Sequence, residues 1–246
     1  MKLSVCIICK NEENTIARCL ESVKWADEII LLDSGSTDNT LEIAKKYTDK
    51  IFIREDWQGF GEQRRRAEQL ASNDWIFAID CDEEVSETLK NEILNTLPRC
   101  SEENVLRINR LTYFCGQFIY HSGWHPDHIA RIYNKKKTSY NRNLVHESVI
   151  TKDCELITLK ENILHFQHQD IFTYLNKRNH YANLGAKQII QKGKKASLSK
   201  ATGSAIFAFI RHYFLRLGFL DGRAGFVIAV IQSQYSFNKY LFSAYK

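Results

Sequence analysis

Proline, methionine and long apolar runs are scarce in this chain of 246 residues. It has two prolines and one methionine, and no low-complexity stretch divides it as a linker would. The apolar stretch 206–220 is interrupted by two Arg and one His, and the stretch 226–231 is too short to cross a bilayer. We therefore expect no simple transmembrane span.

Cysteine is present but not in a pattern that indicates disulfides. The chain has seven cysteines, an odd number, and its 44% hydrophobic content is enough to bury a core without staples. Cys6 and Cys9 have the spacing of a redox motif, but they lie in a predicted strand, where residues three apart point to opposite faces. We expect both to be buried. Because seven uncharged residues separate Lys2 from Lys10, no secretory signal is expected, and a cytoplasmic location fits.

The first hundred residues alternate between two kinds of segment. Short β-rich runs cover 3–9, 28–32, 51–53 and 75–79, and helix-like segments include 13–23 and 86–97. Thr37 or Asp38 can cap a further helix that extends through Tyr47, and Ser86 can cap the segment 86–97. This alternation predicts an α/β fold with a parallel sheet.

Polar residues follow three of the predicted strands. These segments are 10–13 (Lys-Asn-Glu-Glu), 33–38 (Asp-Ser-Gly-Ser-Thr-Asp) and 80–84 (Asp-Cys-Asp-Glu-Glu). Since parallel α/β sheets bind ligands beyond the carboxyl ends of their strands, we expect the three segments to converge. The carboxylates of Asp80 and Asp82 suit Mg²⁺ or Mn²⁺ bound together with a diphosphate. Each segment taken alone is also an ordinary turn.

Together these three segments resemble the family 2 inverting glycosyltransferases, which have a nucleotide-binding GT-A fold. The resemblance rests on 4–13, 33–38 and 80–82. It implies that the uracil and ribose of a UDP-sugar are held by Lys10, Asn11, Glu12 and Asp33. It further implies that Asp80 and Asp82 bind the metal and that Cys81 lies beside the nucleotide. A basic residue in the helix before the metal motif is also expected to contact the nucleotide. Arg64 is the best match within the run Arg64-Arg65-Arg66, and the choice among the three stays open.

The second half is similar to glucosyltransferases that extend a heptose in the inner core of bacterial lipopolysaccharide or lipooligosaccharide. The similarity is carried by 57–61 (Trp-Gln-Gly-Phe-Gly), 123–127 (Gly-Trp-His-Pro-Asp), 131–133 (Arg-Ile-Tyr), 145–147 (Val-His-Glu) and the segment around His165. It implies UDP-glucose as donor and a lipid-linked core oligosaccharide as acceptor. Related members transfer other sugars to other acceptors, such as cell-surface polysaccharides, so this alternative stays open.

An inverting transfer needs a carboxylate near the acceptor hydroxyl to act as general base. Glu147 is the favoured candidate, because the resemblance implies an acidic base at this stage of the chain. Asp127, in a loop that contains Gly and Pro, is the rival. The structural alternatives are that Asp127 ties down a turn and that Glu147 pairs with Arg131 or Arg142.

Many GT-A enzymes complete the metal shell with a late His, and the resemblance implies His165 in this role. His168 is the second choice and His146 a weaker one, and a hydrogen-bonded structural His is the alternative. The residues His121, His125, Asp127 and His128 also look like a ligand cluster, but Gly123 and Pro126 argue against the helix that would align them.

Basic residues are concentrated at the end of the chain. Residues 187–246 contain ten Lys and Arg against Asp221 alone, a net charge of +9, whereas the whole chain carries +5. This aromatic, basic segment predicts helices that lie peripherally on the inner face of the cytoplasmic membrane. A homo-oligomer contact or packing on the catalytic domain is the alternative. The carboxylate-rich surroundings of the other basic runs, without a recognisable binding module, argue against nucleic acid.

These expectations give two domains and one leading function. Residues 1–185 form the GT-A catalytic domain, with a nucleotide-binding part at about 1–100 and an acceptor part at about 101–185, and residues 186–246 form the helical tail. Two other functions compete. A haloacid-dehalogenase-like phosphatase also uses Asp-x-Asp at a strand end, but Glu84 stands where it usually has Thr or Val. A non-catalytic membrane adaptor would need only the tail.

Overall fold

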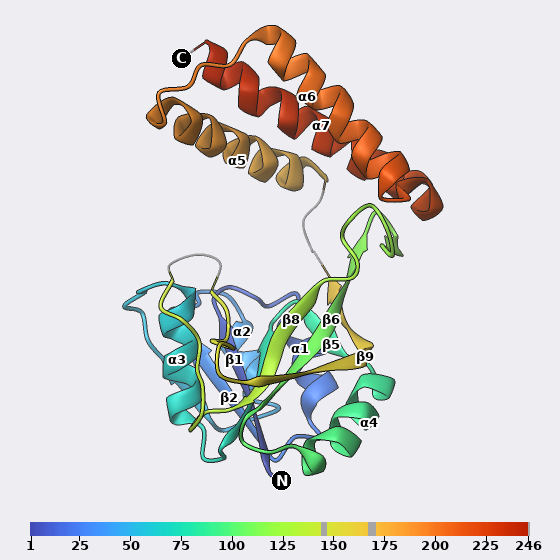
Figure 1. Ribbon diagram of the computed structural model, residues 1–246. Helices are drawn as coiled ribbons and strands as arrows, with labels where there is room; N and C mark the ends of the chain where they lie inside the picture. The colour runs from blue at the N-terminus through green and yellow to red at the C-terminus, as the bar shows by residue number, and fades with distance from the viewer. Residues whose placement is uncertain (144–146, 167–170, 246) are drawn as a thin grey trace. The chain divides into compact units, whose positions relative to one another are not determined.

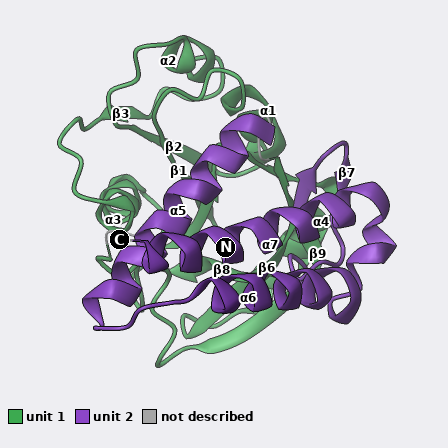
Figure 2. Cartoon of the chain, turned by 90° about the horizontal axis from the view of Figure 1, so that it is seen from above, with its two compact units in different colours: residues 1–111, 127–166 green, residues 112–126, 167–246 purple. Residues whose placement is uncertain are grey.

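A computed structural model describes residues 1–143, 147–166 and 171–245. The chain forms two compact units, coloured separately in Figure 2. Unit 1 comprises Met1–Leu111 and Asp127–Phe166, and unit 2 comprises Thr112–Pro126 and Gln167–Lys246. The expected boundary between residues 185 and 186 differs from this division. It falls inside one continuous helix, α5 (Ile171–Gln191), all of which belongs to unit 2.

Unit 1 is built on a mixed sheet, and most of its strands are labelled in Figure 1. The parallel half consists of β3 (Ile51–Ile53), β2 (Glu28–Asp33), β1 (Leu3–Cys9) and β4 (Trp75–Asp80), in that order. It continues into β8 (His128–Asn134), β6 (Asn104–Phe114), β9 (Glu155–Phe166) and β5 (Glu83–Val85). β8 runs antiparallel to β4, so residues near the start of β8 lie beside the carboxyl end of β4. All four strands expected from the sequence are present.

Helices cover both faces of this sheet. α1 (Ile16–Val23), α2 (Thr40–Ala44) and α4 (Glu87–Thr96, extended by the 3₁₀ turn Leu97–Arg99) contribute to the core on one face, and α3 (Phe60–Leu70) packs on the other. Cys9 belongs to the first core and Cys6 to the second. The two cysteines are therefore buried on opposite faces, as expected for residues three apart in a strand.

The helix caps follow the sequence in one case and depart from it in another. Ser86 Oγ accepts a hydrogen bond from Leu89 N at 3.2 Å, which is the expected N-cap of α4. The helix expected to extend through Tyr47 is shorter, because α2 ends at Ala44. Asp38 nevertheless accepts from Thr40 N at 3.0 Å, so this carboxylate stabilises the start of α2 without being its N-cap residue.

Unit 2 is mainly helical. It contains β7 (Gln117–Phe118), which pairs with the end of β6, followed by α5, α6 (Leu198–Ile210), a π-helix (η2, Arg211–Leu215), a 3₁₀ helix (η3, Gly218–Asp221) and α7 (Gly222–Ala244). Its small core includes Phe114, Ile119, Tyr174 and Ile228. Among the described residues, no helix is long and apolar enough to cross a membrane.

A buried carboxylate joins two parts of unit 2. Asp221 is 4% exposed and accepts hydrogen bonds from Tyr120 N (3.1 Å), His121 N (3.1 Å) and Ser122 Oγ (2.8 Å). These bonds satisfy two backbone groups and one hydroxyl of the loop after β7, and they tie this loop to the start of α7.

Candidate active site

The three polar segments follow strands that end at one edge of the sheet. In the register, Cys9 pairs with Asp33 and Ile8 pairs with Asp80. Asp33 and Asp80 therefore end the two strands that flank β1, two strand spacings or about 10 Å apart. The expected convergence of the segments at the carboxyl edge is confirmed by this register.

Hydrogen bonds join the first two segments into one layer. Asn11 N donates to Ser36 Oγ at 2.8 Å, Thr37 N donates to Asn11 Oδ1 at 2.8 Å, and Glu12 N donates to Thr40 Oγ1 at 2.7 Å. Asn11 has φ +56°, in the left-handed region that Asn tolerates better than most residues. Because its backbone and amide are engaged in this way, Asn11 is held at the surface beside Lys10, and both residues are exposed.

Asp33 is a buried anchor of the second segment. Its side chain is inaccessible to solvent, and its Oδ2 accepts from Gly35 N and Ser36 N, both at 2.8 Å. Its Oδ1 accepts from Ser36 Oγ and from Cys9 Sγ. The carboxylate fixes the turn that presents residues 34–38, so its direct contact with a nucleotide stays a prediction.

Two buried arginines engage the first Asp of the third segment. Arg64, from α3, donates through Nη2 to Asp80 Oδ1. Arg131, from β8, donates through Nη2 to Asp80 Oδ2 at 2.6 Å and to Glu83 Oε1 at 2.7 Å. Glu83 in turn accepts from Asp80 N at 3.0 Å. We name Arg64, Asp80, Glu83 and Arg131 the charged cluster.

The pKa shifts in this region have identifiable causes. Burial by itself would raise the pKa of the Asp80 carboxyl, but Arg131 and Arg64 outweigh it and hold that pKa far below its usual range. Burial raises the pKa of Glu83, against the attraction of Arg131. Burial also raises the pKa of Glu12, and the negative charges of Asp82, Asp38 and Asp80 raise it further. Carboxylates of the first and third segments are thus close enough to interact.

The second Asp of the motif meets His165. The pairing of β5 with β9 sets Glu83 opposite His165, and Phe166 N donates to Asp82 O at 2.8 Å. As a result His165 Nε2 lies 3.1 Å from Asp82 Oδ2. The His165 side chain is 11% exposed and that of Asp82 is 35% exposed.

This pair fits a divalent ion that is shared with a substrate. Adjacent ligands on an octahedral ion, at bonds of about 2.1 Å, are separated by about 3 Å, close to the distance between the two atoms. Within the described part of the chain, no three His, Cys, Asp or Glu side chains gather as a complete metal site. Asp82 and His165 would therefore hold an ion whose remaining ligands come from phosphate oxygens and water.

The candidate bases have different partners from those expected. Glu147 Oε1 lies 3.6 Å from Arg64 Nε, so it belongs beside the charged cluster and pairs with neither Arg131 nor Arg142. Asp127 Oδ2 instead accepts from Arg110 Nε at 3.0 Å and Nη2 at 2.7 Å. Both carboxylates thus pair with an arginine. Only Glu147 shares its arginine with Asp80.

The choice among the three arginines of α3 follows from their contacts. Arg65 donates to Ser139 Oγ at 2.9 Å, and Arg66 pairs with Asp56 at 2.8 Å, both away from Asp80. Arg64 alone of the three reaches Asp80, and its guanidinium lies 5.1 Å from the ring centroid of Tyr140. Its Nη1 is buried and has no hydrogen-bond partner among the described residues.

Several other expectations have a structural outcome. The Cys81 side chain is 5% exposed and donates to Ile8 O at 3.3 Å, so it belongs to the core, and its place beside the nucleotide stays a prediction. His121 hydrogen-bonds to Asp221 through Nδ1 at 3.1 Å and forms no metal cluster with the other described histidines. His146 and His168 lie outside the described residues, so their roles as metal ligands stay predictions.

The run 135–137 lies at the opposite edge of the sheet, beyond the residue of β8 that pairs with Trp75. There, Lys136 pairs with Asp74 and Lys137 pairs with Glu103. Their ion pairs are those of a solvated turn.

Arg131 and Glu83 have site contacts that the motifs in the sequence do not indicate. The signal for Arg131 was a charge within the apolar run 129–133, because an unpaired buried charge is costly and needs a partner. Glu83 had no comparable signal, since an acid directly after Asp-x-Asp reads as an exposed turn residue. Glu83 is buried because β5 pairs with β9, and this pairing cannot be predicted from the sequence around Glu83.

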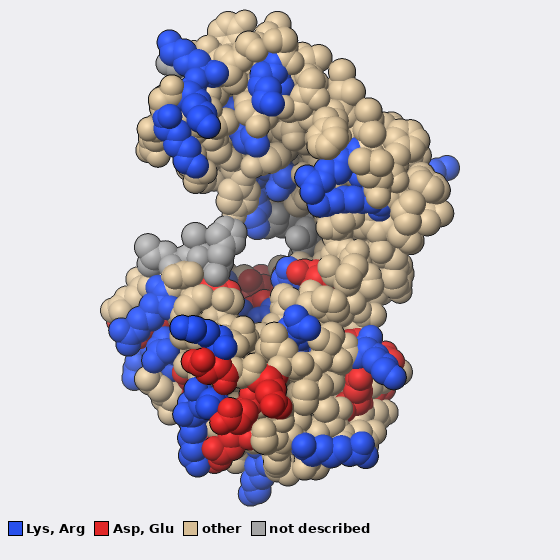
Figure 3. All heavy atoms as spheres, viewed as in Figure 1, with Lys and Arg blue, Asp and Glu red and all other residues tan. Residues whose placement is uncertain are grey.

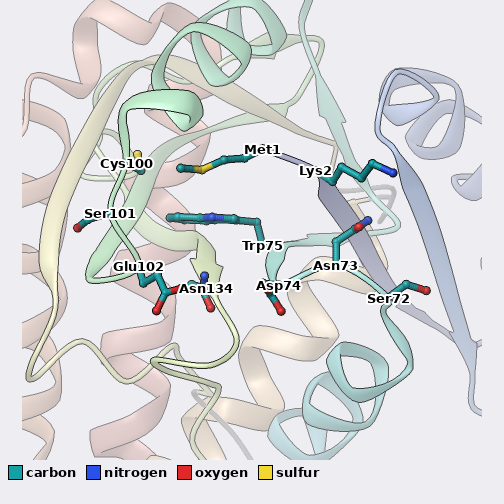
Figure 4. A pocket seen from close by; sticks show the side chains of 10 residues that line it. All are labelled: Met1, Lys2, Ser72, Asn73, Asp74, Trp75, Cys100, Ser101, Glu102 and Asn134. Atoms are coloured by element: carbon teal, nitrogen blue, oxygen red, sulfur yellow. The ribbon is translucent and has the colours of Figure 1, made fainter.

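A separate pocket lies at the amino edge of the sheet. It encloses about 630 Å³ and is shown in Figure 4, where the Trp75 ring lies between Met1 and Asn134. Trp75 is 5% exposed and packs with the core, so it offers little surface for stacking. The pocket includes none of the residues expected to carry chemistry.

Comparison with known proteins identifies the family. The family model described as Glycosyl transferase family 2 matches residues 4–157, more than half of the chain. The chain belongs to glycosyl transferase family 2. An uncharacterized glycosyltransferase of Rickettsia conorii is 35% identical over 246 residues, which cover 94% of this chain and 85% of the relative.

Two further comparisons bear on function and fold. The lipopolysaccharide core biosynthesis glycosyltransferase LpsC of Rhizobium meliloti is 31% identical over 248 residues, covering 96% of this chain and 90% of LpsC. The crystal structure of S. aureus TarS 1–349 in complex with UDP-GlcNAc aligns at 19% identity with a TM-score of 0.50, covering 93% of this chain and 79% of that one. The expected GT-A fold with a C-terminal helical region is confirmed, and the phosphatase interpretation is excluded by the family.

Proposed function

We propose that this family 2 glycosyltransferase is an inverting, metal-dependent enzyme that moves a sugar from a UDP-sugar to a heptose of the lipopolysaccharide or lipooligosaccharide inner core, with glucose as the favoured sugar. The observation that carries the proposal is the meeting of Asp82 and His165 beside the charged cluster, at the edge where β1, β2 and β4 end. This arrangement gathers ligands for a cation next to guanidiniums that suit a diphosphate.

The loops at the carboxyl edge favour a UDP-sugar as the donor. The joined segments 10–13 and 33–38 form a preorganised layer, in which Lys10, Asn11 and Glu12 are the exposed or half-buried candidates for contact with uracil and ribose. Arg64 offers a buried Nη1 without a partner, as expected of a donor that meets a phosphate. The nucleotide in the TarS structure is UDP, which supports uracil as the nucleobase of the donor.

Asp82 and His165 would hold Mg²⁺ or Mn²⁺ on the diphosphate. When bound, the ion offsets the negative charge that develops on the departing UDP. Asp80 was also predicted to be a metal ligand. That role stays a proposal: each of its oxygens accepts one hydrogen bond from an arginine, which leaves a second lone pair on each oxygen for an ion.

Glu147 is proposed as the general base. The acceptor hydroxyl loses its proton to Glu147 as its oxygen bonds to the anomeric carbon, while the bond from that carbon to the UDP oxygen breaks and its electron pair leaves with UDP. Glu147 is preferred to Asp127 because Glu147 lies 3.6 Å from the arginine that also holds Asp80. A base must lie near the reacting carbon, and the charged cluster is where the diphosphate is expected.

The similarity to LpsC favours a particular class of acceptor. LpsC is named for lipopolysaccharide core biosynthesis and aligns over nearly the whole of both chains, which favours a core saccharide linked to lipid. The alternative is a family 2 transferase with another donor or acceptor, such as a cell-surface polysaccharide. The two parts of the catalytic domain, the cytoplasmic peripheral location and a homo-oligomer contact stay predictions from the sequence.

The proposal is tested by transfer with defined partners. A panel of UDP-sugars is offered with truncated core oligosaccharides that end in heptose, and the configuration of the product linkage is read by NMR. We expect transfer from UDP-glucose with inversion. Retention of configuration, or transfer only to acceptors without heptose, would contradict the proposal.

Matched variants separate the two candidate bases. Glu147→Gln should keep UDP-sugar binding and lose most turnover, about 100- to 10,000-fold, because the amide cannot accept the proton. Asp127→Asn makes the same change of charge and size at the rival and should lose far less. The reverse pattern would transfer the role of base to Asp127.

A further inference from the structure

A groove between α6 and α7 in unit 2 is lined by cations and hydroxyls. It encloses about 290 Å³, and we name its polar lining the basic groove: Lys200, Ser204, Arg211, His212, Ser236, Lys239 and Tyr240. None of these residues belongs to the charged cluster or to the segments at the carboxyl edge. The groove is therefore a second candidate site, in a unit for which the site described above assigns no role.

The helical spacing explains why these side chains meet. Lys200, Ser204 and Arg211 recur on one face of α6 and its π-helical extension, and Ser236 and Lys239 do so on α7. Ser233 Oγ donates to Ala205 O at 2.9 Å and ties the two helices together. The ammonium groups of Lys200 and Lys239 lie 5.6 Å and 4.7 Å from the ring centroid of Tyr240, which holds both near the groove.

Among the described residues, no carboxylate pairs with Lys200, Arg211 or Lys239 of the basic groove. Unit 2 has twelve Lys and Arg against two acidic residues, a net charge of +10, and Figure 3 shows Lys and Arg spread over the face of this unit that it draws. Of the two acids, Asp221 is buried and satisfied by the loop after β7, and Asp170 lies outside the described residues. His121, which lies outside the groove, pairs with Asp221. The groove therefore favours an anion.

Exposed apolar side chains adjoin the groove. We name as the apolar ridge the residues Ile206, Phe207, Ile210, Phe214 and Leu215, which are 41–68% exposed. Their spacing places them along one side of α6 and the π-helix, and Phe207 also lines the basic groove. A contiguous apolar stripe bordered by cations is the pattern of a helix that lies in the boundary between headgroups and acyl chains.

The positive charge of unit 2 favours an anionic bilayer over a second copy of the chain as the partner of this surface. A second copy of the chain would bring one unit of net +10 against another, which opposes association through this face. An anionic bilayer instead offers negative charge to the groove and an apolar layer to the ridge. We propose that unit 2 binds an anionic phospholipid surface, with the apolar ridge entering the acyl boundary and the basic groove taking a lipid phosphate. This inference deepens the proposed function. It rests on that function in one respect only, namely that the acceptor is linked to lipid and lies at the same surface.

Co-sedimentation of the full chain with vesicles tests the proposal. We expect binding to vesicles of phosphatidylcholine with phosphatidylglycerol, weakened by salt, and little binding to phosphatidylcholine alone. The combined variant Lys200→Gln, Arg211→Gln and Lys239→Gln should weaken binding about five-fold per charge, or roughly 100-fold together. As a matched control, Lys24→Gln, Lys45→Gln and Lys46→Gln removes three exposed cations of unit 1 and should leave binding within about two-fold.

A second variant tests the apolar ridge. Phe207→Ser with Leu215→Ser removes two side chains that are more than half exposed, so the fold should persist, as circular dichroism would verify. Vesicle binding should fall about five-fold for each change. Unchanged binding by either the groove or the ridge variant, or equal binding to both kinds of vesicle, would overturn the proposal. So would dimers in sedimentation velocity that the ridge variant abolishes, since they would identify a second copy as the occupant.

Two further arms distinguish the source of the phosphate and the fate of the proposed function. If inorganic phosphate at millimolar concentration releases the chain from anionic vesicles at constant ionic strength, the groove prefers free phosphate and the lipid assignment fails. Transfer to a soluble core oligosaccharide is measured on the same samples. Vesicle binding without transfer would contradict the proposed function alone, and transfer without vesicle binding would contradict only this inference.

Discussion

Arg64 and Arg131 give the two carboxylates of the Asp80-Cys81-Asp82 motif different surroundings. Both guanidiniums are buried, and between them they donate to both oxygens of Asp80. Asp82 is left facing His165 at 3.1 Å, with a third of its side chain exposed. At the scale of single residues, the two carboxylates of one motif thus have different surroundings, and Asp82 is the one poised for a cation.

The first residue-scale prediction concerns the metal. UDP should bind more tightly with Mn²⁺ than without it, and Asp82→Asn or His165→Ala should abolish that difference. Loss of a direct ligand should cost at least the 10- to 100-fold that loss of an outer partner typically costs. Calorimetric titration of UDP with and without Mn²⁺ measures the effect, and Glu84→Gln, which changes an acid paired with Arg18, is the control. A manganese effect that survives in Asp82→Asn would exclude the assignment.

At the scale of elements, the sequence predicted the parallel half of unit 1 well and the antiparallel half poorly. The runs that became β1, β2, β3 and β4 are short, apolar and punctuated by turn residues, so local pattern sufficed. β9 carries polar residues, and its role depends on pairing with β5, more than 70 residues earlier in the chain. The contacts of His165 and Glu83 follow from that pairing.

The same limit applies to the candidate site. Asp82, His165 and Arg64 could be proposed because motif residues stand at fixed places in a resembling family. The contact of Arg131 with Asp80 could not, because it requires β8 to run antiparallel to β4. The length of α2 was also mispredicted, since the sequence marked its beginning and not its end.

The element-scale prediction concerns the close approach of α3 to the segment that precedes Glu147. A Cβ on Gly61 would lie 2.1 Å from Asn141 O and 3.2 Å from Asn143 O, so Gly61→Ala must displace backbone. Because Tyr140 and Val149 bridge across this segment, the displacement should reach Glu147 and reduce kcat/KM roughly 10- to 100-fold. Steady-state transfer assays measure it. Gly203→Ala, where an added Cβ meets nothing within 4 Å, should leave transfer unchanged. Equal activity of both variants would contradict the argument.

At the scale of the whole molecule, charge and acid stability are unevenly distributed. Unit 2 carries +10 and unit 1 therefore −5. In unit 1, Glu28 links distant parts of the amino edge of the sheet. It accepts from Ser4 Oγ and Lys50 Nζ, and from Ser72 N at 2.8 Å. One carboxylate thus joins β1, β2, the start of β3 and the turn before β4.

We expect Glu28 to make stability depend on pH. Burial opposes ionisation of Glu28, but its bonds to Lys50, Ser4 and Ser72 lower its pKa to about 2 from an ordinary 4.5. A depressed pKa stabilises the fold above pH 4.5, and this contribution is lost as the pH falls from about 4.5 to 2. Glu28→Gln should therefore lower the free energy of unfolding by about 3 kcal/mol at pH 7.

Urea unfolding from pH 7 down to pH 2 would measure the difference between wild type and Glu28→Gln. The gap should narrow as the pH falls. Glu42→Gln, at an exposed acid paired with Lys45, is the control and should leave the midpoint nearly unchanged. A constant gap across this range would mean that the substitution acts through packing and not through ionisation.

The ladder between β5 and β9 constrains how this chain can vary in length. A slip of one residue would bring Leu164 opposite Glu83 and turn His165 to the other side of the sheet. Insertions or deletions inside 155–165 should therefore be tolerated far less than those in the exposed turn 152–153, which lies outside both strands. Deletion scanning of this region, or splicing of segments from homologous enzymes, would have to preserve the residue count between Glu155 and His165.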